Sequence, residues 1–230
     1  MLSKNDLRNA IASKNRGLSA TENDRAMIAS IIARVEDLNP TPDPLSAPQL
    51  LAGDWRLLYT TSQELLGIDR FPLAQLGDIY QCVRPKESKI YNIAELNSLP
   101  YCEALVSVVA NFEPAQEINR EPAQEMNTEP AQEMNTEPAE DGYNGSNRLS
   151  SRRVNVRFTR GVVGLQRALG YQSAAQHVAK LETTEKLGLL QGLDFAINSD
   201  RQQGWLEVTY LDEDLRIGRG NQGSLFVLTK

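Results

Sequence analysis

The feature that most constrains the fold of this chain is a change in hydrophobic period near residue 53. Before it, apolar residues recur every three to four positions, as on one face of an amphipathic helix. After it, they alternate with polar residues, which is typical of β-strands that bury one face. The strand candidates number eight and span residues 54–62, 78–84, 88–96, 101–112, 151–159, 205–211, 214–219 and 224–229. This pattern predicts a mainly β protein, an antiparallel up-and-down barrel that is either filled by side chains or open to one small ligand.

Two helices are expected in residues 1–52, ahead of the barrel domain over residues 53–230. Ser3 and Asp6 are placed to cap the first helix, which we expect to end at Gly17. Ser19 and Glu22 form the S-x-x-E pattern of a capping box for the second helix. An Asn-Pro pair then stops that helix, whose apolar face holds Ile28, Ile31, Ile32, Val35 and Leu38. A Pro-rich linker leads to the first strand.

Residues 113–150 interrupt the strand pattern with a drifting octad repeat, EPAQEINR, EPAQEMNT and EPAQEMNT, followed by EPAED. Prolines at this spacing exclude both a long helix and a central strand, so we expect a solvated, disordered insert. Residues 113–141 of the insert hold nine acidic residues and one base, whereas the whole chain has a net charge of −6. The rest of the chain is therefore slightly basic, at +2, which argues against a strong nucleic-acid binder.

The last part of the chain, YLDEDLRIGRGNQGSLFVL over residues 210–228, resembles two kinds of functional loop at first sight. As a calcium loop counted from Asp212, it lacks the glycine at position 6 and the glutamate at position 12. Its G-x-G-x-x-G spacing is followed by a strand-like run, where a nucleotide-binding loop requires a helix. A β-hairpin with a glycine-bearing turn at Asn221–Gly223 fits instead. We therefore predict neither a metal nor a cofactor here.

Several other classes of protein find little support in the sequence. No apolar run approaches the roughly 18 residues of a membrane span. The N-terminus lacks the apolar region of a signal peptide, and its early Asp6 is unlike a transit peptide. Cys82 and Cys102 fall in separate strand candidates, which favours buried free thiols in a reducing compartment. A single histidine, His177, offers little material for histidine-based catalysis or a multi-histidine metal site.

Two long motifs carry a family resemblance: LAGDWRLLYTTSQELLGI near residue 51 and GWLEVTYLDEDLRIGRGNQGSLFVLTK at the end of the chain. Together with the N-terminal ARVEDLNPTPDP, they resemble the plastid lipid-associated proteins, or fibrillins. The resemblance covers nearly the whole chain outside the octad insert. It implies a lipocalin-like barrel associated with thylakoids and lipid globules, with roles in lipid, carotenoid and prenylquinone homeostasis and in photoprotection. Without a transit peptide, the chain resembles a cyanobacterial-type member, peripheral on the cytoplasmic side of the thylakoid membrane.

The same resemblance implies a structural signature. Gly53 and Trp55 match the G-x-W of lipocalin-like barrels, in which an arginine of the last strands packs on the indole. Arg216 and Arg219 are both candidates for this arginine. Two acidic residues would orient the arginine without acting as catalytic acids, and the full signature is Gly53, Trp55, Asp212, Asp214, Arg216, Arg219 and Gly220.

The favoured function is that of a non-enzymatic carrier or organiser of a carotenoid, prenylquinone or lipid. Its lumen would be lined by Trp55, Leu57, Tyr59, Tyr91, Val154, Val156, Phe158 and Tyr210. One alternative is a lipocalin-like bilin lyase, whose chromophore would be held by Arg153, Arg157, Asp212 and Asp214. Another is a module that only binds proteins at the photosynthetic membrane. Two segments, 63–77 and 171–197, lie outside the strand pattern and would either plug the barrel or contact a membrane.

Overall fold

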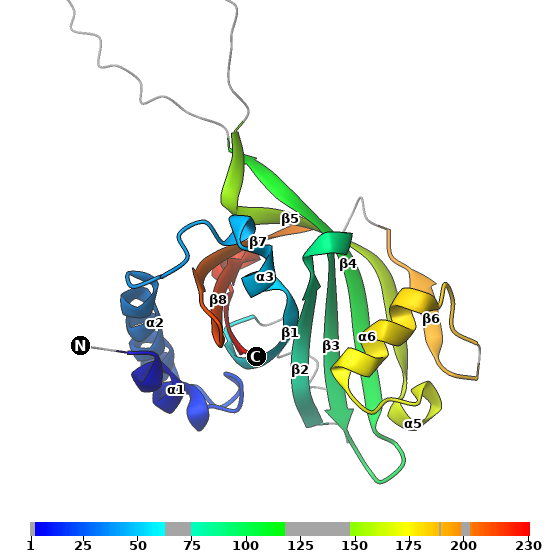
Figure 1. The fold of residues 1–230 in the computed structure, drawn as a ribbon. Coiled ribbons are helices and arrows are strands. Elements are labelled where there is room, and N and C mark those ends of the chain that lie inside the picture. The colour runs from blue at the N-terminus through cyan, green and yellow to red at the C-terminus, as the bar shows by residue number, and fades with distance from the viewer. Residues whose placement is uncertain (1–2, 63–74, 118–147, 189, 199–202) are drawn as a thin grey trace, which may run out of the picture.

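The computed structural model describes residues 3–62, 75–117, 148–188, 190–198 and 203–230, and within them the chain forms a closed antiparallel barrel (Figure 1). Hydrogen-bonded neighbours follow the order β4-β3-β2-β1-β9-β8-β7-β5, and β4 also pairs with β5, which closes the ring. The eight barrel strands are β1 (Gly53–Thr60), β2 (Gln75–Arg84), β3 (Lys89–Asn97), β4 (Ala104–Glu117), β5 (Arg148–Leu165), β7 (Gln203–Leu211), β8 (Leu215–Gly220) and β9 (Leu225–Thr229). The predicted eight-stranded barrel is confirmed.

A ninth strand, β6 (Leu193–Ala196), was not expected and lies outside the ring. It forms because β5 is 18 residues long and serves two partners in turn. Residues Arg153–Arg157 of β5 pair with β7, whereas Arg160–Val163 pair with β6. Leu193 and Phe195 fall in segment 171–197, which the sequence pattern placed outside the strands, because alternation over only four residues is too short to identify a strand.

The insert is shorter than the sequence indicated. β4 continues to Glu117 and β5 begins at Arg148, and these two residues are paired Cα partners at the end of the ladder. The expectation of disorder from 113 to 150 is therefore wrong at both ends, since Pro114 lies on β4 opposite Val154. A proline can occupy a strand position at which its missing N–H is not needed by a neighbour. Residues 118–147 of the insert lie outside the described residues.

Removing residues 118–147 should leave the barrel intact. Because Glu117 and Arg148 are paired across the ladder, a short Gly-Ser turn can join them without moving either strand. The shorter connection reduces the entropic cost of closing the loop by about 0.6 kcal/mol per halving of loop length. We expect a melting temperature equal to or slightly above that of the full chain, measured by circular dichroism. Loss of cooperative melting would show that the octads contribute packing.

The two N-terminal helices cover one outer side of the barrel (Figure 1). They are α1 (Lys4–Ala12) and α2 (Glu22–Glu36), and their apolar faces pack on outward residues of β1, β7, β8 and β9. Ser3 and Asp6 form a capping box on α1, as expected. The box on α2 uses Thr21 and Asp24 instead of Ser19 and Glu22, so that expectation is wrong by two residues.

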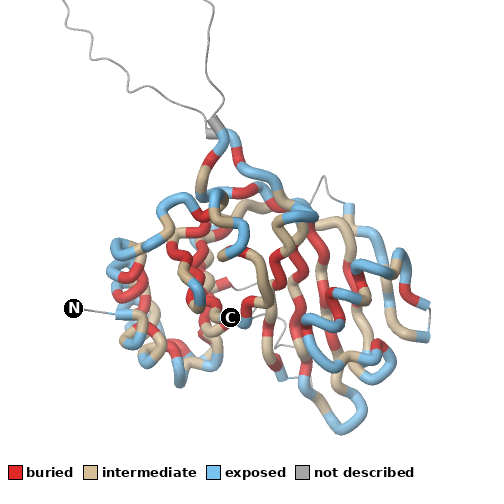
Figure 2. Tube along the Cα trace, viewed as in Figure 1, coloured by how far each residue is buried: buried red, intermediate tan, exposed pale blue. Residues whose placement is uncertain are grey.

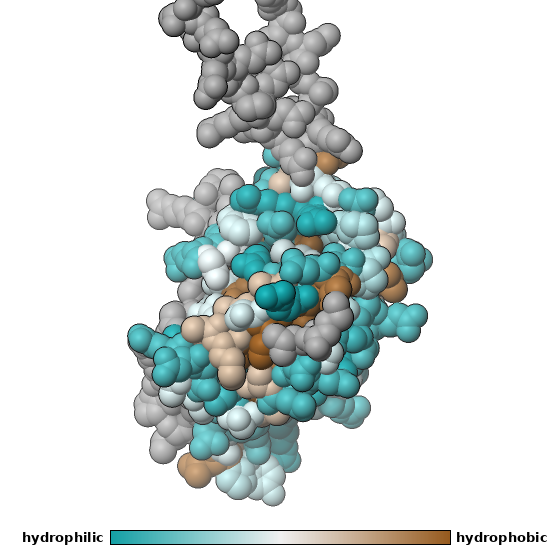
Figure 3. Space-filling view, turned by 90° about the vertical axis from the view of Figure 1, so that its left-hand side faces the viewer, coloured by the Kyte–Doolittle hydropathy of each residue, from teal (hydrophilic) through white to brown (hydrophobic). Residues whose placement is uncertain are grey.

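Two further details of this helical pair differ from expectation. Leu38 lies beyond the end of α2 and is 51% exposed, whereas Ile28, Ile31, Ile32 and Val35 are buried as predicted. Gly17 does not end α1, which stops at Ala12. It lies at φ +109° against the carbonyl of Thr60, where a Cβ would approach within 2.2 Å of the oxygen. Figure 3 looks onto this side, where apolar surface at the centre is ringed by hydrophilic surface.

Short helices close one end and one side of the barrel. η1 (Pro44–Ser46) and α3 (Pro48–Leu51) form within the Pro-rich linker, and Leu51 of α3 reaches the core. A further 3-10 turn, η3 (Pro85–Glu87), joins β2 to β3, and η4 (Asn221–Gly223) joins β8 to β9 in the predicted hairpin. α5 (Gln166–Leu169) and the amphipathic α6 (Ala174–Thr183) lie on the outside of β2–β5. Figure 2 shows buried residues along the strands and on the inner faces of the helices.

The barrel is therefore packed on three surfaces. Its interior holds the first apolar cluster, the α1–α2 side holds the second, and the α5–α6 side holds the third. Both cysteines are free, and Cys82 is buried in the third cluster as expected. Cys102 is exposed, because β4 begins only at Ala104. Most of the apolar segment 63–77 lies outside the described residues, so neither a plug nor a membrane contact is assigned to it.

Candidate functional site

The barrel interior contains a cavity of about 320 Å³. Its wall is mostly apolar, and the side chains that form it come from β1 to β5 and β9, among them Leu57, Ile79, Ile90, Val108, Val156, Phe158 and Leu228. Residues 204–206 and 220–224 form its rim, where β7 begins and the β8–β9 turn lies. Concave apolar cavities of this size are typical of small-molecule sites. We refer to this cavity as the lumen.

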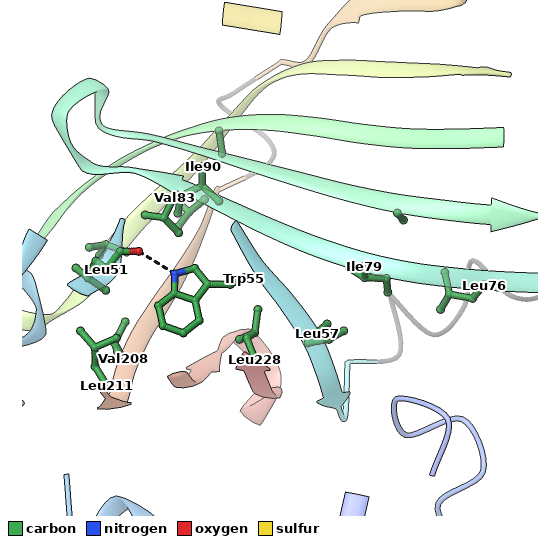
Figure 4. Packing of buried hydrophobic residues seen from close by; sticks show 14 of the residues in the cluster. Leu51, Trp55, Leu57, Leu76, Ile79, Val83, Ile90, Val208, Leu211 and Leu228 are labelled. Atoms are coloured by element: carbon green, nitrogen blue, oxygen red, sulfur yellow. Dashed lines mark hydrogen bonds between the residues drawn. The ribbon is translucent and has the colours of Figure 1, made fainter. Parts of the chain in front are cut away.

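Trp55 fills the opposite, closed end of the barrel and has no exposed surface. Its indole Nε1 donates a hydrogen bond of 2.8 Å to the carbonyl of Leu51, which ties β1 to α3. Figure 4 shows the ring among Val83, Leu228 and the other core residues, with Leu57, Ile79 and Leu76 lying further along the barrel. The closed end is thus a packed core, whereas the lumen begins beyond it.

Arg216 is the arginine that packs on this tryptophan. Its guanidinium carbon lies 4.9 Å from the Trp55 ring centre, and the residue is only 2% exposed. Burial lowers the pKa of Arg216 to about 9, so the group stays charged at neutral pH. Within the described parts of the chain, no carboxylate forms an ion pair with it, and its side-chain hydrogen bond goes to Gln81 Oε1. The ammonium of Lys230 also lies near Trp55, at 4.7 Å from the ring centre.

Arg219, the other candidate, has a different role. It lies on the outer side of β8 and forms a bidentate pair with Glu36 of α2, at 2.6 and 3.1 Å. Hydrogen bonding to this carboxylate raises the pKa of Arg219. The choice between the two arginines, which the sequence left open, is therefore settled by the direction in which each points from its strand.

Asp212 and Asp214 do not orient the arginine on Trp55, in contrast to the expectation. Lys4 of α1 donates to both carboxylates at 2.7 Å, and Arg8 donates to Asp214 at 2.8 Å. These hydrogen bonds hold the pKa of Asp214 well below its usual range. The acidic β7–β8 turn thus anchors the first helix to the barrel. The two glycines of the signature also lie in the barrel wall, Gly53 beside Lys230 and Gly220 beside Phe226.

Five of the eight residues predicted to line the lumen face the barrel interior. Leu57, Val156 and Phe158 line the lumen itself, while Trp55 and Val154 belong to the packed interior. The other three, all tyrosines, point outward. Tyr59 and Tyr210 pack under α1 and α2, and Tyr91 packs under α6.

Strand irregularities explain two of these corrections. A register shift lies between Leu57 and Tyr59 on β1, and another lies between Val208 and Tyr210 on β7. A bulge adds one residue to a strand and reverses the face of every residue after it. Tyr91 sits on β3, which is buried on both faces, so alternation could not tell inside from outside.

Sequence reasoning missed two polar residues of the lumen, Gln81 and Asn92. Gln81 lies between the inward Ile79 and Val83, and Asn92 lies between the inward Ile90 and Ala94. A polar residue in an inward position of an otherwise apolar strand is the signal that could have identified them. Gln81 Nε2 donates to Asn92 Oδ1 at 3.0 Å across β2 and β3.

The structure offers little support for catalysis or metal binding. No group of three potential metal ligands occurs within the described ranges. The one histidine, His177, lies on the inner face of α6 with its Nε2 3.0 Å from Ser107 Oγ on β4, and both residues are buried. Its Nδ1 has no partner among the described residues, so a third group that would orient a catalytic pair is missing there.

The four residues proposed as a bilin cradle are not gathered in one site. Arg153 and Arg157 are exposed on the outer face of β5, where Arg153 lies 4.0 Å from the Trp205 ring centre. Asp212 and Asp214 are engaged by α1. The geometry therefore gives no support to the lyase alternative.

Comparison with known proteins identifies the family of this chain. A family model described as PAP_fibrillin matches residues 1–121 and 146–229. The chain belongs to the fibrillin family. This fibrillin is 31% identical to the light-induced chloroplastic protein of Solanum tuberosum, over all of the chain and 67% of the relative. It is 31% identical to the plastid-lipid-associated protein of Citrus unshiu and 30% identical to the chromoplast-specific carotenoid-associated protein of Cucumis sativus, over 94% of the chain in each case. No solved structure matches it.

The relatives correct the predicted location. They are named as chloroplastic or chromoplastic proteins, which contradicts the expected location of a chain without a transit peptide on the cytoplasmic side of a thylakoid. This fibrillin spans about two thirds of their length, between 63% and 67% for these three. The names of the relatives from Citrus unshiu and Cucumis sativus associate them with plastid lipids and carotenoids, which supports a lipid-associated role for the family.

Proposed function

We propose that this fibrillin is a non-enzymatic protein whose lumen binds a carotenoid, a prenylquinone or another apolar lipid. The observation that carries the proposal is the cavity of about 320 Å³ with a mostly apolar wall. Burial of apolar ligand surface there would contribute about 25 cal/mol per Å². The names of the relatives from Citrus unshiu and Cucumis sativus support this class of ligand. Photoprotection and lipid homeostasis at thylakoids or lipid globules are the proposed physiological role.

Ligand binding in the lumen should quench Trp55. The chain has two tryptophans, and Trp205→Phe leaves Trp55 as the only one, next to the inner end of the lumen. Titration of this variant with a decyl-substituted benzoquinone should give a saturable loss of fluorescence. Adding Val108→Phe and Val156→Phe fills the lumen from two strands and should weaken binding by at least about tenfold, or 1.4 kcal/mol.

A surface variant serves as the matched control for this titration. Asn155→Phe lies on β5 beside Val156, but its side chain is exposed on the outer face. It should bind the quinone like its parent. If no variant shows saturable quenching, or if the filled lumen quenches normally, binding within the lumen is excluded.

We also propose a peripheral membrane contact at the end of the barrel where β4 begins and β5 ends. Here the β3–β4 turn, α5 and the segment before β6 lie together (Figure 1), as the Ala104–Leu165 pair and the contact of Gly164 with Gly192 show. Exposed apolar residues gather at this end: Leu99, Tyr101, Leu165, Leu190 and Leu193. None of the described helices has the length and apolarity needed to span a bilayer.

Replacing two of these leucines should weaken membrane association. Leu190 and Leu193 are 96% and 69% exposed, so Leu190→Ser with Leu193→Ser should leave the melting temperature nearly unchanged. Each leucine inserted into lipid contributes about 1.5–3 kcal/mol, so vesicle partitioning should fall at least about tenfold. Co-sedimentation with galactolipid vesicles measures this. The control is Leu149→Ser, an exposed leucine at the other end of β5; an equal loss in that variant would contradict the assignment of this end.

A further inference from the structure

A chain of polar side chains crosses three strands where the lumen meets the closed end. Trp55 on β1 is the Cα partner of Gln81 on β2, and Gln81 is the Cα partner of Asn92 on β3, so the three lie at one level of the barrel. Arg216 reaches this level from β8 and contacts both Trp55 and Gln81. Gln81 and Asn92 both line the lumen.

Arg216 fixes the direction of every hydrogen bond in this chain. A guanidinium can only donate, so the group of Gln81 that faces it must be the amide oxygen. The Gln81 nitrogen is thereby turned toward Asn92, and the Asn92 oxygen must accept from it, at 3.0 Å. The Asn92 amide nitrogen is left over. It has no hydrogen-bond partner in the described chain, and its residue lines the lumen. The arginine therefore decides both amide orientations.

The positive charge at the closed end also strengthens the free Asn92 donor. Arg216 is buried with no carboxylate paired to it in the described ranges, and the ammonium of Lys230 lies on the same tryptophan. A cation at one end of a hydrogen-bond chain polarises the members that follow, so the terminal N–H of Asn92 is a stronger donor than an isolated amide. The inner end of the lumen thus combines a positive potential with a free donor.

We infer that the lumen takes an amphiphile whose polar end presents an acceptor oxygen, a carbonyl or a carboxylate, to the Asn92 amide nitrogen, with its apolar tail toward the rim. This inference rests on the proposed lumen binding and specifies its ligand. An unsubstituted hydrocarbon would leave the Asn92 donor buried without a partner, which is costly inside an apolar cavity. A ligand whose oxygen faces Asn92 satisfies that donor and meets the field of Arg216. Selectivity is therefore expected to come from one polar contact and affinity from the apolar wall.

Competition against a bound quinone tests the inference. With Trp205→Phe protein and the decyl-substituted benzoquinone as quencher, displacement restores Trp55 fluorescence. Three competitors share chain length and differ in their polar end: dodecane, 2-dodecanone and dodecanoate. We expect 2-dodecanone or dodecanoate to displace the quinone at about tenfold lower concentration than dodecane, which corresponds to one hydrogen bond from a polarised donor. Dodecanoate ahead of the ketone identifies a carboxylate ligand, and equal potency identifies a carbonyl ligand.

One variant at Asn92 makes the assignment specific, because it removes the donor and keeps the acceptor that Gln81 Nε2 needs. Asn92→Asp replaces the donor with an anionic acceptor and should abolish displacement by dodecanoate while dodecane still competes. Displacement by dodecane at the same concentration as by the ketone and the carboxylate in the parent protein would overturn the inference and leave lumen binding standing. Failure of the quinone to quench at all would overturn both.

Discussion

Trp55→Ala should lower the free energy of unfolding by about 3–5 kcal/mol, the range for deleting a large aromatic side chain from a core. The indole is completely buried at the closed end, and its N–H donates to Leu51. Truncation therefore leaves a cavity and a carbonyl of α3 without its donor. Urea denaturation followed by circular dichroism measures the loss. Trp205→Ala is the matched control, because Trp205 also stacks on an arginine, at 4.0 Å from Arg153, but is only half-buried.

The control separates burial from the cation–π contact. An exposed cation–π pair contributes about 0.5–1 kcal/mol, so Trp205→Ala should cost about 1 kcal/mol or less despite its shorter distance. If the two tryptophans cost the same, the closed end is not the packed core that its burial indicates.

Replacing Arg216, which packs on Trp55, should not lower the free energy of unfolding, in contrast to replacing Trp55 itself. Arg216→Met keeps an unbranched apolar stem of similar length and removes a buried cation that has no carboxylate partner in the described chain. Replacing a buried charge by a well-packed apolar residue is often neutral or stabilising by about 1–4 kcal/mol. We therefore expect no loss of stability in Arg216→Met. In a double-mutant cycle with Trp55→Ala, a coupling of about 0.5–2 kcal/mol should report the cation–π contact itself.

This pattern distinguishes a structural arginine from one kept for the lumen. If Arg216→Met unfolds the protein, the arginine has a structural role in closing the barrel. If the variant is as stable as the parent and loses the preference for acceptor oxygens, the buried charge serves the ligand.

The barrel could be predicted because its signal is distributed over many residues. Alternation is repeated along strand after strand, and errors at strand ends do not change the architecture. Hairpin turns such as Asn221–Gly223 could also be identified from local composition alone. The wrong predictions concern features that depend on a single residue, such as the N-cap of α2, which is Thr21 and not Ser19.

The lining of the lumen was harder to predict, because it depends on the side of the strand from which each side chain points. One extra residue in β1 and one in β7 turned Tyr59 and Tyr210 outward, and no sequence pattern marked either bulge. The roles of Arg216 and Arg219 likewise depend on which side of β8 each occupies, since one reaches Gln81 and the other Glu36. Such choices require tertiary structure, because an amphipathic helix covers the outer face and makes both faces of the strand apolar.

Acidification should destabilise the protein through His177. The imidazole lies on the inner face of α6 and is 1% exposed, and burial, with Lys180 and Arg160 nearby, lowers the pKa of His177 to about 4. The unfolded chain takes up this proton near pH 6.5, whereas the folded chain does so only near pH 4. Between these values the unfolded state binds more protons, so the free energy of unfolding decreases as the pH is lowered. The contribution of His177 is fully present above pH 6.5, and about 3 kcal/mol of it should be lost by pH 4.

His177→Gln isolates this contribution from the carboxylates that titrate in the same range. Glutamine can keep a hydrogen bond to Ser107, which lies 3.0 Å from Nε2 in the parent, but it takes up no proton. The difference in free energy of unfolding between parent and variant should therefore change by about 3 kcal/mol between pH 7.5 and pH 4. Parallel profiles would contradict a neutral, buried His177. Protonation makes both ring nitrogens donors, and Nδ1 has no partner in the described chain, so the first consequence of acid should be loss of α6 packing on β2–β5. Hydrogen exchange in α6 at pH 4.5 should then accelerate before exchange in β1, β8 and β9, because His177 belongs to α6 and not to the cluster around Trp55.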